Sequence, residues 1–267
     1  MITPDQYRRI AATITTIADA EILTRFRSLT DADITEKRPG DLVTTADRVA
    51  EERLTETLQN LLPGSVTVGE EAVSADPAII EQLNGDAPVW VIDPVDGTSN
   101  FVAGQPDYAC LVSLTMSGST VASWMYAPSL GLTAGALTGT GAWINDTPHT
   151  LVTRPTTRRL DIVTTHRNYT HGHRPVLDKL RRDDITTTDC RAAGLTYIDL
   201  AQGRHDALVY TWENPWDHAA GLHLYQTCGG SHATVTGQPF NLAGGNALPF
   251  IVATADIIGR LTTILTA

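Results

Sequence analysis

The chain has 267 residues, of which 42% are hydrophobic, and it carries a formal net charge of -11 at pH 7. A chain of this length can bury a large core, either as one compact unit or as two closely packed lobes. The acidic balance argues against a nucleic-acid-binding surface, for which a basic stripe would be expected. No apolar run is long enough to span a bilayer, so we expect no membrane partner.

The cysteines and the first residues indicate the compartment. Cys110, Cys190 and Cys228 are widely separated and odd in number, which is typical of small core residues in a reducing environment rather than of a disulfide framework or a zinc site. The N-terminal segment contains Asp5 and Asp19 and has no uninterrupted apolar stretch after a basic start. We therefore expect no signal peptide and a cytoplasmic location.

Helical periodicity dominates the first sixty residues. Apolar residues predict a first helix from about Pro4 to Leu29, followed by a polar loop from Asp31 to Asp41. A second helix is expected to open at Thr44 or Thr45 and to end at Pro63-Gly64. Short runs of β-forming residues bounded by Gly, Pro or Ser then predict strands at Val66–Val68, Val89–Ile92, Leu111–Met116, Val121–Tyr126 and Leu132–Leu137.

After residue 147 the pattern changes to an alternation of strands and helices. The expected elements are a strand at Leu160–Thr165, helices at Pro175–Arg182 and Ala193–Gln202, a strand at Ala207–Tyr210, a helix at Trp216–Thr227, a strand at Phe250–Ala253 and a helix at Asp256–Leu265. This alternation is typical of an α/β unit. We therefore predict an N-terminal α+β lobe, residues 1–147, and a C-terminal α/β lobe, residues 148–267.

The most informative segment runs from Val89 to Phe101, where an apolar strand leads into Asp93, Asp96 and a Gly-Thr turn. Carboxylate oxygens are ligands for a hard cation such as Mg²⁺, and the end of the strand is expected to place them at a solvent-facing edge. Gly97 lets the backbone bend, and a helix opening at Thr98 would offer free N–H groups to an anion. Together these features indicate phosphate, although Asp-Pro and Asp-Gly alone could simply mark turns.

Three further blocks accompany this segment, at Asp41–Asp47, Val66–Glu71 and Pro215–Gly221. In order and spacing the four blocks resemble those of the inositol monophosphatase family, and the resemblance extends from roughly Ile10 to Leu261. It implies a layered αβαβα sandwich, a Mg²⁺-dependent phosphatase and a homodimer. We expect no lysine near the four blocks, so that bound cations supply the positive charge that a phosphate ester needs.

The resemblance also assigns metal ligands residue by residue. One Mg²⁺ is expected on Glu70, Asp93 and the backbone carbonyl of Val95. A second is expected on Asp93, Asp96 and Asp217, so that Asp93 bridges the two. Cations about 3.5 to 4 Å apart would clamp the phosphate, one activating water and the other stabilising the leaving oxygen. A third, weaker Mg²⁺ held through Glu70 and waters is implied by the resemblance only.

The same comparison suggests catalytic roles, each with a simpler alternative. Thr98 is expected to orient the attacking water with Glu70, and Asp47 to hydrogen-bond the Thr98 hydroxyl. Asp47 could instead be only the acid of a helix capping box, and Asp217 could simply favour the first turn of its helix. Glu71 is expected to be a solvated neighbour of Glu70, with the alternative that it orients a metal-bound water.

Substrate recognition is where the sequence departs from the family. Members that act on inositol phosphates usually carry a glutamate seven residues before the last metal-binding aspartate, but here that position is Tyr210, with Glu213 displaced nearby and Leu195 in place of a small residue. We expect the loss of this carboxylate to shift specificity away from substrates whose leaving group is a hydroxyl-rich ring. Tyr210 could instead stack against a planar or cationic group. The predicted substrate-binding residues are Asp96, Gly97, Thr98, Ser99, Gly194, Tyr210 and Asp217.

The sequence therefore predicts hydrolysis of a small phosphate monoester, with inositol 1-phosphate as the first candidate and histidinol phosphate as the main rival. A regulatory binding protein of the same fold with residual phosphatase activity remains an alternative. The nucleotide-type branch of the superfamily is disfavoured, because no lysine follows Thr98.

Overall fold

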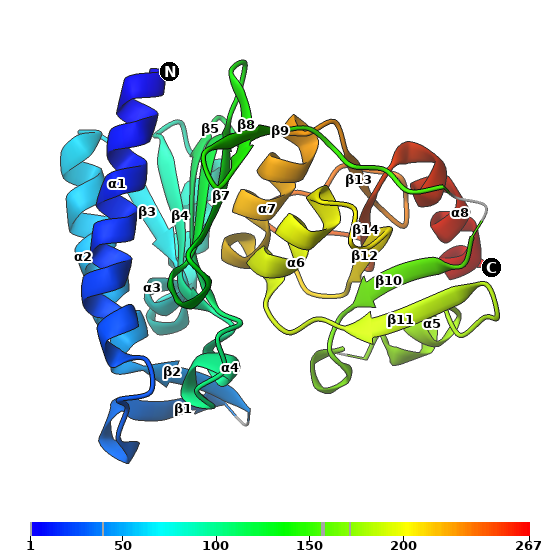
Figure 1. Cartoon of the computed structure of the whole chain (residues 1–267), viewed down its shortest axis with the longest axis horizontal. Coiled ribbons are helices and arrows are strands. Elements are labelled where there is room, and N and C mark those ends of the chain that lie inside the picture. The colour runs from blue at the N-terminus through cyan, green and yellow to red at the C-terminus, as the bar shows by residue number, and fades with distance from the viewer. Residues whose placement is uncertain (1, 39, 156–157, 171) are drawn as a thin grey trace.

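The structure is a computed structural model that describes residues 2–38, 40–155, 158–170 and 172–267. Helices and sheets alternate in five layers across the molecule (Figure 1). A helical layer covers one face of a seven-stranded sheet, two helices fill the space between this sheet and a five-stranded sheet, and two more helices cover the far face. This is the layered sandwich that the family resemblance implied.

The first layer consists of α1 (Pro4–Glu21) and α2 (Thr45–Leu61). Each helix begins with a capping box, and each buries an apolar face against Trp90 and Trp124 of the sheet. The prediction that the first helix continues to Leu29 is wrong. A 3₁₀ turn at Leu23–Arg25 follows α1, and the chain then leaves helical geometry at Phe26 and at Arg27, which has a positive φ.

A β-hairpin occupies the segment that was predicted to be a polar loop. Strand β1 (Ile34–Arg38) pairs antiparallel with β2 (Asp41–Thr44). The residues of β1 are mostly charged or polar, so the hairpin has too little apolar alternation to be recognised from the sequence. It lies beside α4 (Thr98–Val102), at the lower edge of Figure 1.

The seven strands of the first sheet follow one another in both sequence and space. Their bounds are β3 (Val66–Gly69), β4 (Val89–Asp96), β5 (Ala109–Met116), β6 (Ser119–Ala127), β7 (Leu132–Leu137), β8 (Gly141–Ile144) and β9 (Thr147–His149). Among these seven strands, as far as the structure describes them, only β3 and β4 pair in parallel. The sequence reading missed β8 and β9, which are short, and β9 extends the sheet two residues past residue 147. The division into two lobes there stays a prediction.

The second sheet has the order β11-β10-β12-β14-β13. Its strands are β10 (Leu160–Thr164), β11 (Ile185–Asp189), β12 (Ala207–Tyr210), β13 (Ser231–Thr234) and β14 (Phe250–Ala253). Strand β10 is parallel to both of its neighbours, whereas β14 is antiparallel to both of its own. The edge strands β11 and β13 were not predicted, because polar residues predominate in both.

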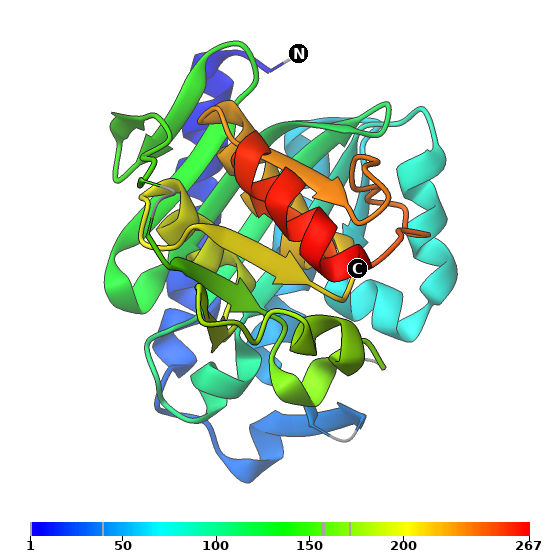
Figure 2. The ribbon, with the colours of Figure 1, turned by 90° about the vertical axis from the view of Figure 1, so that its right-hand side faces the viewer.

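Helices α6 (Ala193–Ala201) and α7 (Pro215–Thr227) form the central layer. Both are buried on nearly all sides, since each faces a sheet on two opposite flanks. Helices α5 (Arg174–Asp178) and α8 (Ala255–Thr266) cover the outer face of the second sheet, and Figure 2 shows α8 lying across it. In the part of the chain that the structure describes, no helix is long and apolar enough to cross a membrane.

Candidate active site

Strand β4 places Asp93 and Asp96 in the interior. The prediction that both carboxylates face solvent is wrong, because the strand continues through Asp96 and the two residues are only 1% and 5% exposed. The register explains how they can meet. Asp93 pairs with Leu111 and Asp96 with Ala109, so three steps on β4 oppose two on β5. This extra residue interrupts the alternation of a regular strand, in which residues three apart point to opposite faces.

A third carboxylate joins them from the central layer. One oxygen from each of Asp93, Asp96 and Asp217 lies within 4.8 Å of the other two. Burial raises the pKa of Asp96 to about 7 and that of Asp217 to about 6, and it raises the pKa of Asp93 well above its usual range, with further contributions from Glu70 and Asp96. Asp93 Oδ1 is buried without a hydrogen-bond partner among the described residues. Buried, mutually repelling oxygens with an unsatisfied member suit a hard divalent cation.

Backbone groups at the start of α6 hold Asp96 in this position. Its two oxygens accept hydrogen bonds from Ala193 N at 2.9 Å and from Gly194 N at 2.7 Å. A Cβ at position 194 would lie 2.4 Å from Leu111 Cδ2 and 3.2 Å from Asp96 Oδ2, so a larger residue there would displace both side chains. Gly194 therefore has a role in packing against the acidic cluster.

The loop before α7 fixes Asp217. Its Oδ2 accepts hydrogen bonds from Trp212 Nε1 at 2.9 Å and Asn214 Nδ2 at 3.1 Å. Trp212 is itself anchored, since His218 Nε2 lies 3.1 Å from the Trp212 carbonyl oxygen. Sequence analysis did not identify Trp212 or Asn214 as partners of Asp217. The signal that could have found them is their position in the loop just before the helix that carries Asp217.

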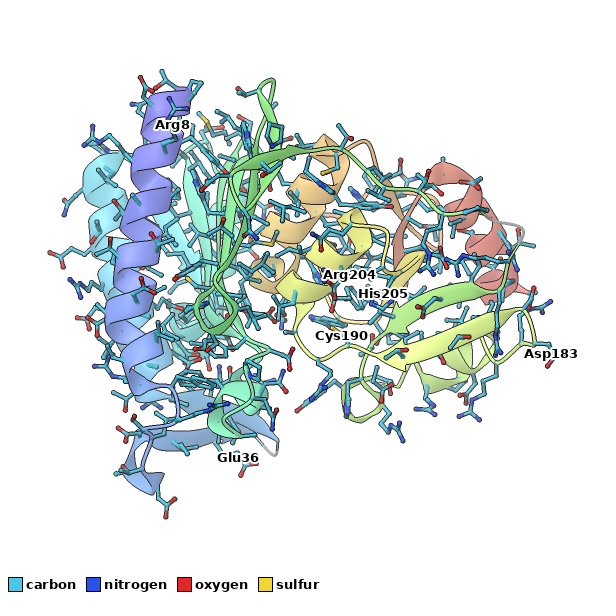
Figure 3. All side chains as sticks on the ribbon, viewed as in Figure 1. Arg8, Glu36, Asp183, Cys190, Arg204 and His205 are labelled. Atoms are coloured by element: carbon cyan, nitrogen blue, oxygen red, sulfur yellow. The ribbon has the colours of Figure 1, made fainter. Side chains whose placement is uncertain are left out.

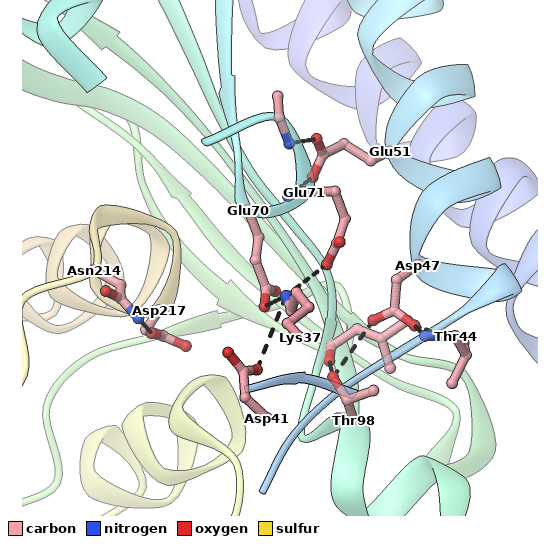
Figure 4. Close-up of polar contacts among 12 residues, drawn as sticks. Lys37, Asp41, Thr44, Asp47, Glu51, Glu70, Glu71, Thr98, Asn214 and Asp217 are labelled. Carbon is pink, nitrogen blue, oxygen red and sulfur yellow. Dashed lines mark hydrogen bonds and ion pairs between the residues drawn. The ribbon is translucent and has the colours of Figure 1, made fainter. Parts of the chain in front are cut away.

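A lysine does reach the site, contrary to our expectation. The hairpin brings Lys37 Nζ within 2.8 Å of Glu70 Oε1 and 2.9 Å of Glu71 Oε1, and to 4.0 Å from Asp41 (Figure 4). Its side chain is 13% exposed, and although burial alone lowers the pKa of Lys37, the attraction of Glu70 and Glu71 outweighs it and raises the pKa. The prediction that Glu71 is a solvated neighbour is also wrong, because its side chain is only 13% exposed and takes part in this ion pair.

Asp47 and Thr98 approach each other as predicted. Asp47 Oδ2 accepts hydrogen bonds from Thr44 N and Thr44 Oγ1, so the capping box is real. Its other oxygen lies 3.4 Å from Thr98 Oγ1, which donates more closely to the Val95 carbonyl at 2.9 Å. Burial raises the pKa of Asp47 to about 6. The structural and the proposed functional contacts of Asp47 therefore coexist.

The turn into α4 opens beside these groups. Gly97 caps the helix with φ +87°, and a Cβ there would lie 2.8 Å from the Asp107 carbonyl oxygen, so both the dihedral and the space require glycine. Gly97 and Thr98 are half-buried and Ser99 is exposed. The first N–H groups of any helix lack partners within it, so this turn presents donors close to the acidic cluster.

Comparison with known proteins identifies the family. The sequence matches the inositol monophosphatase family over residues 3–261. This chain belongs to the inositol monophosphatase family. Members of this family are phosphoric monoester hydrolases, and magnesium is typical of them.

Individual relatives agree with this assignment. The inositol-1-monophosphatase of Bacillus subtilis is 31% identical over 209 residues, which cover 77% of each chain. A protein of Neisseria meningitidis named putative Nus factor SuhB is 30% identical over 234 residues, or 85% of each chain. The crystal structure of SaIMPase-II from Staphylococcus aureus with bound inositol monophosphate superposes with a TM-score of 0.77, covering 96% of this chain and 92% of that one. At 21% identity this last likeness concerns the fold.

One predicted site residue of this family member lies elsewhere. Tyr210 is 0% exposed, its ring lies 4.2 Å from that of Trp212, and its hydroxyl donates to Cys190 Sγ at 3.4 Å. The prediction that Tyr210 faces a substrate is therefore wrong for this structure, because β12 is an inner strand covered by α7. Glu213, the displaced acid, accepts hydrogen bonds from Asn246 N and Nδ2, both at 2.9 Å.

Proposed function

We propose that this chain is a Mg²⁺-dependent phosphatase of small phosphate monoesters, with inositol 1-phosphate as its first candidate substrate. The observation that carries the proposal is the convergence of the buried Asp93 and Asp96 with the half-buried Asp217, together with Asp93 Oδ1, which has no hydrogen-bond partner among the described residues. Three such carboxylates stay ionised at neutral pH only where a positive charge compensates them, because otherwise their raised pKa values lead them to take up protons. Lys37 supplies only part of it, because its nitrogen bonds Glu70 and Glu71, and although its charge lowers the pKa of Asp217, burial outweighs it and the pKa of Asp217 is still raised.

The residues fit the family's metal assignment in part. Asp93, Asp96 and Asp217 would hold one cation, and Glu70 with the Val95 carbonyl would hold a second together with Asp93. Bound Mg²⁺ would neutralise the phosphate and lower the pKa of a nucleophilic water. We propose two cations, with a third on Glu70 resting on resemblance alone.

The chain's own groups would then align the reactants. Thr98 Oγ1 lies 2.9 Å from the Val95 carbonyl oxygen and 3.4 Å from Asp47 Oδ1, so the hydroxyl could turn from the carbonyl to donate to Asp47 while its oxygen accepts a hydrogen bond from a water. Backbone N–H groups at Gly97, Thr98 and Ser99 would bind phosphate oxygens. Phosphoryl transfer requires mainly alignment and charge neutralisation, so these groups suffice without a covalent nucleophile.

The choice of substrate rests on the relatives. Inositol is named both for the Bacillus subtilis relative and for the ligand of SaIMPase-II. Histidinol phosphate was favoured by a stacking role for Tyr210, and the burial of that ring removes this support. It stays in the assay as the main rival, and the half-buried Trp212 beside Asp217 is the aromatic group that a flat leaving group could meet.

A regulatory role is the second candidate, and one observation favours it. The Neisseria meningitidis relative is named as a putative Nus factor. Such a protein could keep the fold and the acidic cluster while acting mainly through a partner. We also infer a homodimer and a cytoplasmic location from the family resemblance, and light scattering of the purified chain would test the first.

A phosphate-release screen separates the two candidates. The purified chain is incubated with inositol 1-phosphate, histidinol phosphate and glycerol 2-phosphate, with Mg²⁺ or with EDTA. We expect release that requires Mg²⁺ and is fastest for inositol 1-phosphate. Release of equal rate in EDTA would overturn the metal mechanism, and no release from any ester would favour the regulatory role.

A further inference from the structure

Helix α2 carries two buried carboxylates one turn apart. Asp47 reaches Thr98, as described above, and Glu51 lies four residues later on the same face of the helix. Glu51 is 6% exposed and was not identified in the sequence. Both acids therefore point from α2 toward segments that carry proposed catalytic residues.

Glu51 binds the first turn of α3 (Glu70–Ala75). Its Oε2 accepts a hydrogen bond from Glu71 N at 2.8 Å, and its Oε1 accepts one from Ala72 N, also at 2.8 Å (Figure 4). Contact with the preceding residue is equally close. A Cβ on Gly69 would lie 2.4 Å from Glu51 Cδ and Oε1 and 2.7 Å from Oε2. The carboxylate thus touches the backbone on both sides of Glu70.

A six-residue helix cannot maintain its own geometry. Isolated helices need about 12 to 15 residues to be even marginally stable, and the first N–H groups of a helix have no internal acceptor. The cap residue of α3, Gly69, has no side chain that could serve as one. Glu51 supplies that acceptor from another helix, and its negative charge at the N-terminus is favourable.

We propose that Glu51 is a positioning residue, which fixes the first turn of α3 and thereby sets where the Glu70 carboxylate lies for cation binding. This inference rests on the proposed function. Two successive turns of α2 would then position the two residues that are predicted to bind the attacking water. Asp47 contacts Thr98 directly, and Glu51 positions Glu70 by holding the first turn of α3. A residue with only a structural role would stabilise the fold without affecting the cation.

Two substitutions of Glu51 test the proposal in the full chain. Glu51→Gln keeps the length but offers an N–H₂ to one of the two backbone donors, and Glu51→Asp keeps the charge but is shorter by one methylene. The neighbouring exposed Glu52→Gln is the matched control. Mg²⁺ affinity is measured by calorimetry, kcat and KM by phosphate release, and Tm without Mg²⁺ by scanning fluorimetry.

We expect both Glu51 variants to bind Mg²⁺ at least tenfold more weakly and to lose kcat at saturating Mg²⁺ by a similar factor, with the substrate KM within twofold of wild type. Glu52→Gln should match wild type throughout. Gly69→Ala, which displaces the carboxylate from the opposite side, should reproduce the Glu51 phenotype and add nothing when combined with Glu51→Gln.

A lower Tm with unchanged Mg²⁺ affinity and kcat would overturn the positioning role. Failure of Glu51→Gln, Glu51→Asp and Gly69→Ala to fold would also overturn it, since Glu51 would then serve the fold alone. If wild type binds Mg²⁺ and releases phosphate while Glu51→Gln is indistinguishable from it, only this inference fails. If wild type does neither, the proposed function itself fails.

Discussion

Replacing Asp96 with asparagine should alter stability and catalysis in opposite directions. The substitution removes one charge from the buried trio and keeps the size of the side chain. It also disturbs the two hydrogen bonds from Ala193 N and Gly194 N, because an amide accepts through one oxygen only. The net effect on metal-free stability therefore depends on which of these two consequences is larger.

The structure gives both magnitudes. Burial and the nearby Asp217 raise the pKa of Asp96 from its ordinary 3.8 to about 7, so ionising this carboxyl at neutral pH costs the folded chain about 4 kcal/mol. An acid whose pKa is raised by folding loses stability as pH rises, here between about pH 4 and pH 7. Against this, one buried N–H left without an acceptor costs about 1 to 3 kcal/mol. The variant should be more stable at pH 7 by about 1 to 3 kcal/mol.

Scanning fluorimetry in EDTA at pH 5 and pH 7 measures this balance. We expect a Tm several degrees higher for Asp96→Asn at pH 7, because about 1 kcal/mol shifts the Tm of a chain of this size by roughly 2 to 4 °C, and we expect the two melting curves to converge at pH 5. Asp183→Asn, at an exposed position that points away from the molecule in Figure 3, should change neither. With Mg²⁺, kcat should fall at least about 100-fold. A variant that melts well below wild type at pH 7 would refute the reasoning.

Two further substitutions test the corrected parts of the site. Lys37→Gln removes the positive charge that pairs with Glu70 and competes with a cation there. Calorimetry should therefore show Mg²⁺ binding at least about tenfold tighter, a gain of about 1.4 kcal/mol. The Tm without Mg²⁺ should fall, because Glu70 and Glu71 lose their counter-charge. Lys179→Gln, at the chain's other lysine, is the control, since Lys179 Nζ bonds only the distant Leu265 carbonyl among the described residues. Weaker Mg²⁺ binding by Lys37→Gln would contradict this prediction and show that Lys37 assists the cation. Tyr210→Glu places a carboxylate in the core, so we expect the free energy of unfolding, measured in urea, to fall by several kcal/mol. We expect no gain in kcat/KM for inositol 1-phosphate relative to glycerol 2-phosphate. A gain of about tenfold would show that Tyr210 belongs to the substrate site after all.

The sequence predicted those parts of the site that lie at the ends of recognisable elements. Asp93 and Asp96 follow an apolar run, so the local pattern locates both, whereas Asp217, in the first turn of the helix that begins at Pro215, was assigned through the family resemblance. Lys37 could not be placed in this way. It acts 33 residues away from Glu70, and the strand that carries it has no apolar periodicity.

Burial was harder to predict than position. Asp96 is covered by central helices that come from a much later part of the chain, and Tyr210 is covered because β12 is an inner strand that packs against α7. The residues next to Asp96 and Tyr210 in the sequence do not indicate either kind of burial. The edge strands β11 and β13 were missed for a related reason. A strand with few apolar residues carries little period-two signal, although backbone pairing with its neighbour still forms it.

The central layer links the folding of the two halves during synthesis. Helices α6 and α7 cover a sheet that emerges from the ribosome long before them, and they share a core with Leu111, Met125 and Ala134 of that sheet. A nascent or truncated chain that ends before residue 190 therefore exposes an apolar sheet face, together with two aspartates that have no partner from α7. Such fragments should be bound by chaperones or aggregate, and the complete chain should unfold in one cooperative step.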